Sequence, residues 1–162
     1  MKKTLLTILI LIFVVSVVYA KHKKHPAVNG KEILSVSLKH GGCYGRCPIY
    51  NIDVSNNGTV TYTGLMFVKD SGAYTKDIGV TKVKKLFDQF NTYRVDTCSK
   101  VYINRIPDLS SIYYSIVYKD ATQTISNANL GPAFLKELTN KIDSMGMVDN
   151  TWKKVVINGT KQ

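Results

Sequence analysis

The sequence lacks the short motifs that mark the commonest hydrolases and nucleotide-binding enzymes. It has no Gly-x-Ser-x-Gly elbow, no His-Glu-x-x-His pair and no glycine-rich phosphate loop. A Ser/His/Asp triad would have to use His40, and no serine or aspartate stands out as its partner. Asp96 and Asp108 flank an irregular stretch, but they suit turn capping equally well. We therefore favour a non-catalytic protein over an enzyme, and we expect no cofactor.

Arginine is also scarce. The chain carries a formal charge of +11, yet only three of its 22 basic residues are arginines, at positions 46, 94 and 105. Nucleic-acid sites depend on arginine for paired hydrogen bonds to the bases. An excess of lysine is typical of a solvated surface, so we expect no nucleic-acid partner.

Only one long apolar run is present, and it lies at the N-terminus. Lys2 and Lys3 precede the apolar stretch 5–19, and Val18-Tyr19-Ala20 has the form of a signal cleavage box. The apolar stretch is shorter than the roughly 20 residues that a membrane-spanning helix needs. We interpret residues 1–20 as a bacterial signal peptide, with a retained anchor as the alternative. The protein is then periplasmic or secreted, and does not span the membrane after cleavage.

The rest of the chain has the length and composition of one folded domain. Hydrophobic residues make up 44% of the sequence, and no low-complexity block occurs, which argues against disordered and fibrous classes. Residues 21–32 are basic and contain Pro26 and Gly30, so we expect a flexible leader there. We expect a single α+β domain over residues 33–152 and a C-terminal tail over residues 153–162.

Alternation of apolar and polar residues predicts about six strands. Residues 34–39 alternate in this way, as in a strand with one buried face that begins near Ile33. Asn56-Asn57-Gly58 suits a hairpin turn. On the strand 111–118, alternation places Tyr114 on the core side and Tyr113 outside. The further strands that we expect are 49–54, 59–63, 73–78, 111–118 and 122–126.

Two amphipathic helices complete the expected fold. Apolar residues recur at helical spacing from Val83 to Phe90, and we expect Thr81 to cap this helix. Gly131-Pro132 opens a second helix, which Gly146 closes. The expected order is ββββ-α-ββ-α. It describes a mainly antiparallel sheet with both helices packed on one face, in the α+β class.

Two motifs lie close together in the first half of the chain. Residues 43–50 read Cys-Tyr-Gly-Arg-Cys-Pro-Ile-Tyr, and residues 58–62 read Gly-Thr-Val-Thr-Tyr. They resemble a family of exported bacterial domains of unknown function with the pattern Cys-aromatic-Gly-x-Cys-Pro-x-Tyr before a Gly-Thr-Val-x-Tyr hairpin. The resemblance extends over residues 33–152 and brings no established activity. It implies a candidate functional loop made of Gly42, Cys43, Tyr44, Gly45, Cys47, Pro48 and Tyr50.

Three cysteines follow the signal peptide, so an oxidising compartment leaves one of them unpaired. A bridge from Cys43 or Cys47 to Cys98 would close a long loop and stabilise the fold more on the entropy model. Proximity and the neighbouring glycines favour a Cys43–Cys47 bridge instead. The resemblance favours the short bridge as well, because Cys98 lies outside the family pattern.

These observations leave two hypotheses. In the first, the chain is a non-catalytic interaction or structural module whose Cys43–Cys47 loop contacts an unknown envelope protein or surface. In the second, it is a thiol-dependent protein that handles a metal such as copper, or carries out redox chemistry, through Cys43 and Cys47. His40 is the candidate third metal ligand in that case. The first hypothesis requires no metal.

Overall fold

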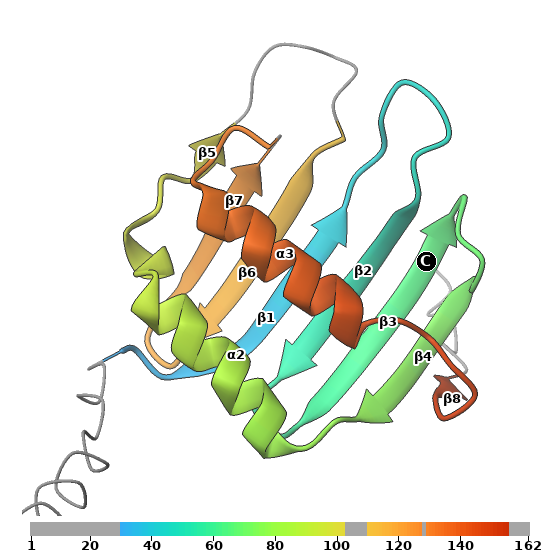
Figure 1. Ribbon diagram of the computed structural model, residues 1–162, viewed down its shortest axis with the longest axis horizontal. Helices are drawn as coiled ribbons and strands as arrows, with labels where there is room; N and C mark the ends of the chain where they lie inside the picture. Colours follow the sequence, from blue (N-terminus) through green and yellow to red (C-terminus); the bar gives the residue numbers. More distant parts are fainter. Residues whose placement is uncertain (1–29, 103–109, 128, 156–162) are drawn as a thin grey trace, which may run out of the picture.

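One eight-stranded sheet carries two helices on a single face (Figure 1). The computed structural model describes residues 30–102, 110–127 and 129–155. The strands lie in the order β5-β7-β6-β1-β2-β3-β4-β8, and the β5–β7 pair is parallel while the other pairs are antiparallel. In chain order the elements are β1 (Ile33–His40), β2 (Ile49–Ser55), β3 (Thr59–Met66), β4 (Gly72–Asp77), α2 (Val80–Thr92), a 3-10 turn (Val95–Thr97), β5 (Val101–Tyr102), β6 (Ile112–Tyr118), β7 (Thr122–Asn127), α3 (Ala133–Met145) and β8 (Lys153–Val155).

The α+β class, the two helices and the mainly antiparallel sheet are confirmed, but the prediction of about six strands is wrong. β5 lies in a stretch expected to be irregular, and β8 lies in the segment expected to be a tail. β5 pairs with β7 over two residues, and β8 pairs with β4 over three. Strands this short contain too few residues to show an alternating pattern. The order of strands and helices is therefore ββββ-α-βββ-α-β.

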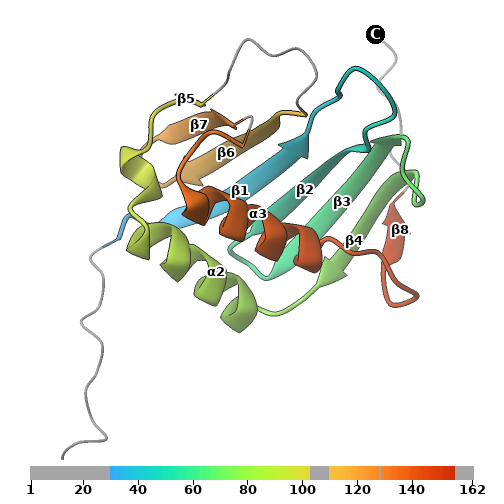
Figure 2. The same cartoon turned by 45° about the horizontal axis from the view of Figure 1, so that its top comes forward.

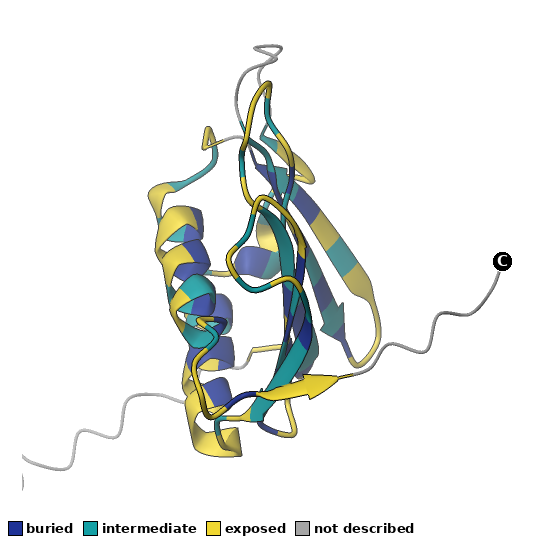
Figure 3. Ribbon diagram, turned by 90° about the vertical axis from the view of Figure 1, so that its right-hand side faces the viewer, coloured by how far each residue is buried: buried dark blue, intermediate teal, exposed yellow. Residues whose placement is uncertain are grey.

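Alternation along the strands separates the sheet into a covered face and an open face. Val36 and Leu38 of β1 are fully buried, whereas Lys39 of the same strand is exposed. Tyr114 is 1% exposed and Tyr113 is 43% exposed, as predicted from the same period. Figure 3 shows both helices on one side of the sheet, with their buried residues turned toward it. No helix of the described residues lies on the opposite face.

The two helices lie side by side across the covered face (Figure 2). The predicted apolar face of α2 is buried, from Val83 to Phe90. The expected cap is wrong, because α2 starts one residue before Thr81 and Gly79 occupies the capping position without a side-chain hydrogen bond. Gly79 has a φ of 86°, which glycine adopts at little cost. Pro132 precedes α3 and Gly146 follows it, as predicted.

Within the residues that the structure describes, no helix is long and apolar enough to cross a membrane. The segment interpreted as a signal peptide, and the leader up to residue 29, lie outside the described residues.

Tyr114 connects the centre of the sheet to α3. Its hydroxyl donates a hydrogen bond to the carbonyl oxygen of Leu135 at 2.7 Å and also contacts the hydroxyl of Thr139. Its ring packs against the edge of Phe90 of α2, with 6.4 Å between the ring centroids. One buried side chain on β6 thus fixes the position of both helices.

We expect Tyr114→Phe to lower the free energy of unfolding by about 1–2 kcal/mol, because it removes a buried hydrogen bond and keeps the ring. Urea denaturation followed by circular dichroism measures this change. Tyr113→Phe is the matched control on the open face, with an expected change of less than about 0.5 kcal/mol. Equal losses in the two variants would contradict the prediction.

Candidate functional site

α3 covers only part of the sheet, because it ends at Met145. The ends of β1, β2 and β3 extend beyond it toward the loop between β1 and β2 (Figure 1). Gly146 allows the end of α3 to approach β2 closely, since a Cβ atom at this position would collide with the side chain of Ile52. The helix therefore stops directly over β2 and leaves the neighbouring surface uncovered.

The uncovered surface is a groove of about 460 Å³ between the end of α3, strands β2 and β3, and the turn between β3 and β4. Two of its apolar side chains are unusually exposed, Phe67 at 51% and Met147 at 73%. Phe67 belongs to the β3–β4 turn and has a positive φ of 54°, which only a few per cent of residues other than glycine adopt. The lining of the groove includes Pro48, Tyr50, Tyr62, Phe67, Asp143 and Met147.

A row of aromatic rings crosses four neighbouring strands at the groove. His40 of β1 stacks on Tyr50 of β2, with 4.2 Å between the ring centroids. Tyr62 of β3 lies 5.6 Å from Tyr50, and Tyr74 of β4 lies 6.4 Å from Tyr62. Cross-strand aromatic pairs of this kind stabilise a sheet and restrict the motion of the rings. Tyr50 and Tyr62 of this row therefore form a rigid part of the groove lining.

Asp143 in the last turn of α3 joins the helix to the row. Its Oδ1 atom accepts a hydrogen bond from the Tyr50 hydroxyl at 3.0 Å and lies 2.9 Å from Nε2 of His40. His40 is the last residue of β1 and Tyr50 lies near the start of β2, so the two residues flank the loop between these strands. Sequence reasoning identified His40 but not Asp143, because the two are separated by 103 positions and no local motif connects them.

The groove tyrosines are hydrogen-bond donors at neutral pH. Burial, and then the neighbouring carboxylate of Asp143, raise the pKa of Tyr50 well above its usual value. Burial, and then the charge of Asp70, raise the pKa of Tyr62 in the same direction. Both phenols therefore keep their protons at neutral pH and can donate hydrogen bonds.

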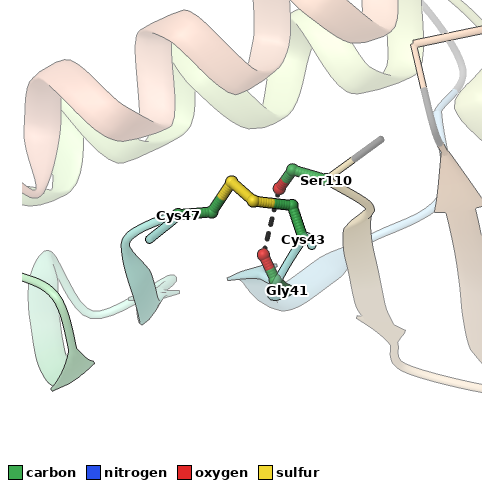
Figure 4. The surroundings of a disulfide bond; sticks show 4 residues. All are labelled: Gly41, Cys43, Cys47 and Ser110. Carbon is green, nitrogen blue, oxygen red and sulfur yellow. Dashed lines mark hydrogen bonds between the residues drawn. A yellow bond between two sulfur atoms is a disulfide. The ribbon is translucent and has the colours of Figure 1, made fainter. Parts of the chain in front are cut away.

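The loop from Gly41 to Pro48, here called the disulfide loop, contains the predicted cysteine pair (Figure 4). Cys43 and Cys47 lie at disulfide distance, with 5.7 Å between their Cα atoms. The start of the loop is held next to the beginning of β6, because the Gly41 amide donates to the carbonyl of Ser111 at 2.8 Å. The hydroxyl of Ser110 donates to the carbonyl of Gly41 at 3.0 Å.

The candidate residues divide between the groove and the loop. Pro48 and Tyr50 line the groove. The other members of the predicted loop are outside its lining, and Tyr44 is 90% exposed. Those other members are Gly42, Cys43, Tyr44, Gly45 and Cys47.

The alternative metal set is not assembled in the oxidised chain. Cys43 is paired with Cys47, and His40 is hydrogen-bonded to Asp143. Among the residues that the structure describes, no group of three or more histidine, cysteine, aspartate or glutamate side chains could hold a metal ion. Cys98 is unpaired and partly buried, and burial raises the pKa of its thiol. Thiol or metal chemistry at Cys43 and Cys47 stays a prediction for the reduced protein.

The chain belongs to a family described as a domain of unknown function (DUF6438), whose model matches residues 34–146. This match extends from β1 to the glycine that follows α3, so it includes the disulfide loop and most elements around the groove. No curated protein and no solved structure matches the chain. A domain-of-unknown-function family is thus confirmed, while the particular cysteine motif and the exported, bacterial character of the family stay predictions.

We expect the double variant Cys43→Ser/Cys47→Ser to lose about 2 kcal/mol of unfolding free energy, because a short closed loop restricts the unfolded chain by about this amount. Urea denaturation measures the loss, and Cys98→Ser is the matched control with a smaller change.

Intact mass after alkylation tests the same pairing in the native protein. One label before reduction, located on Cys98, and three labels after it would agree with the structure. Labels on Cys43 and Cys47 before reduction would contradict the pairing and favour the thiol hypothesis.

Proposed function

We propose that this domain is exported by a bacterium and acts, in the periplasm or outside the cell, as a non-catalytic interaction module. Its groove beside the disulfide loop receives apolar side chains of an envelope protein. The observation that carries this proposal is the exposure of Phe67 and Met147 at one uncovered groove. Large apolar side chains gathered at a surface hollow mark interaction sites far more often than scattered ones do.

The walls of the groove are held in place before any partner arrives. Asp143 binds His40 and Tyr50, and the disulfide restrains the loop that leads into Pro48. A preformed site costs less conformational entropy on binding than a flexible one. This rigidity supports a recognition role for the groove.

The size and polarity of the groove favour a protein partner with an apolar contact segment. A volume of about 460 Å³ is near the lower end of the range of small-molecule sites, so the groove can take a few side chains of a partner's contact segment but not a large ligand. Tyr50 and Tyr62 add aromatic edges, which are enriched in protein interfaces. Asp70 and Asp143 in the lining can meet a polar or basic group beside the apolar segment.

Export predicts a processed N-terminus. We expect the protein purified from the periplasm or medium of its bacterial host to begin at Lys21 and to lack the mass of residues 1–20. Intact mass together with N-terminal sequencing measures this. Recovery of the full-length chain in the membrane fraction would instead favour the retained anchor.

Photo-crosslinking in the envelope tests the groove. A photoreactive amino acid in place of Tyr44, at the exposed tip of the disulfide loop, should give a discrete crosslinked protein. Phe67→Ser and Met147→Ser should each lower its yield about tenfold, since truncation of a central apolar contact costs 1–2 kcal/mol or more.

Val80→Ser is the matched control, because Val80 is 55% exposed at the start of α2, away from the groove. An unchanged yield in Phe67→Ser and Met147→Ser, or an equal loss in Val80→Ser, would refute the groove as the contact surface.

A further inference from the structure

The open face of the sheet is rich in hydroxyl groups. Outward positions on β7, β6, β1, β2 and β3 are mostly serine or threonine. A stable protein interface has a hydrophobic centre, which these positions do not supply. Six of these residues lie in two neighbouring rows that cross the sheet and also contain Asn51 and Asp53 of β2: Thr124, Ser126, Ser115, Ser37, Thr61 and Thr63.

This face contains a hollow of about 310 Å³ across β7, β6, β1 and β2. In the register of the sheet, Lys39 stands between Tyr113 and Asn51. Ser37 stands next to Ser115 in the adjoining row. The volume is at the lower limit of the range for small-molecule sites, so one or two small rings would fill it.

Asn51 gives the hollow an unpaired hydrogen-bond acceptor. Its Oδ1 atom is buried and has no hydrogen-bond partner among the described residues. Buried polar atoms without partners are rare in folded proteins, because each one loses its hydrogen bonds to water and gains none in return. Rotation of the Asn51 amide toward the hollow would let a donor group of a ligand satisfy this atom.

Tyr113 gives the hollow a flat aromatic surface. The ring is 43% exposed, in contrast to the buried ring of Tyr114 beside it. The backbone of Gly41 supports the ring, since a Cβ atom there would lie 2.9 Å from Cε2 of Tyr113 and 3.1 Å from the carbonyl oxygen of Ser111. An exposed, supported aromatic ring among hydroxyl groups suits the apolar C–H face of a sugar ring, whose edge carries hydroxyl groups.

Lys39 gives the hollow a positive charge that is not neutralised nearby. It is exposed and forms no ion pair with any carboxylate of the described residues. Asp53, two residues along β2 from Asn51, accepts a hydrogen bond from Ser37 instead. The ammonium group is therefore available to an anionic ligand.

We propose that this hollow binds an acidic saccharide, a sugar that carries a carboxylate. The sugar ring stacks on Tyr113, one of its hydroxyl groups donates to Oδ1 of Asn51, and its carboxylate pairs with Lys39. Ser37, Ser115 and Thr124 exchange hydrogen bonds with the remaining hydroxyl groups. The site lies on the opposite face from the groove and is independent of the function proposed above.

Nuclear magnetic resonance titration tests the proposal on the ¹⁵N-labelled chain with its disulfide formed. The probes are disaccharides of galacturonate, mannuronate and glucuronate, each with its methyl ester as the neutral counterpart. Salt at about 150 mM suppresses loose attraction of anions to a basic protein. We expect saturable shifts at Ser37, Asn51 and Tyr113 with at least one acid, and weaker binding of its ester.

Substitutions show which side chains of the hollow contribute to the affinity. Tyr113→Ala should raise Kd roughly three- to tenfold, as expected for the loss of an aromatic stack, whereas Tyr113→Phe keeps the ring and the affinity. Lys39→Gln should raise Kd roughly two- to fivefold, as expected for an exposed ion pair. Lys82→Gln on α2 removes the same charge far from the hollow and should leave Kd unchanged. The spectrum of each variant shows directly whether it is folded.

Three results would overturn the proposal. The first is the absence of saturable shifts with all three acids. The second is a set of shifts confined to the groove around Tyr50 and Phe67. The third is equal affinity for acid and ester together with no effect of Lys39→Gln on Kd. This result would show that the carboxylate of the sugar does not contribute to binding.

Discussion

The two-residue alternation of the antiparallel strands is the constraint on which the rest of this structure depends. A register shift of one residue in β1 would turn Val36 and Leu38 to solvent and bring Ser37 and Lys39 under the helices. Burial of the apolar set therefore fixes the register. The same register places His40 beside Tyr50 on the covered face, and Lys39 beside Asn51 on the open face. Both candidate sites follow from one pattern of strand pairing.

The groove on the covered face forms where α3 ends. The hydroxyl of Tyr114 holds the first turn of the helix through Leu135, and Asp143 holds its last turn through His40 and Tyr50. Gly146 then ends the helix against Ile52. A longer helix would bury more apolar surface but would also close the groove. The exposed side chains of Phe67 and Met147 thus result from where the helix stops.

The long elements could be predicted from the sequence, because each repeats its pattern over many residues. The buried face of α2 and the opposite orientations of Tyr113 and Tyr114 were found in this way. β5 and β8 were missed because their two and three residues contain no repeat. Asp143 and the unpaired acceptor of Asn51 could not be found either. Their roles depend on which distant side chains the sheet brings together, and one strand's sequence does not record this.

The disulfide loop is the element that touches both faces. At its start the Gly41 backbone supports the ring of Tyr113 on the open face, and at its end Pro48 lines the groove on the covered face. A bridge to Cys98 would have closed about fifty residues and restricted the unfolded chain more strongly. The short Cys43–Cys47 bridge contributes less to global stability, so its main physical effect is local. It limits the conformations of a segment whose two ends position residues at both sites.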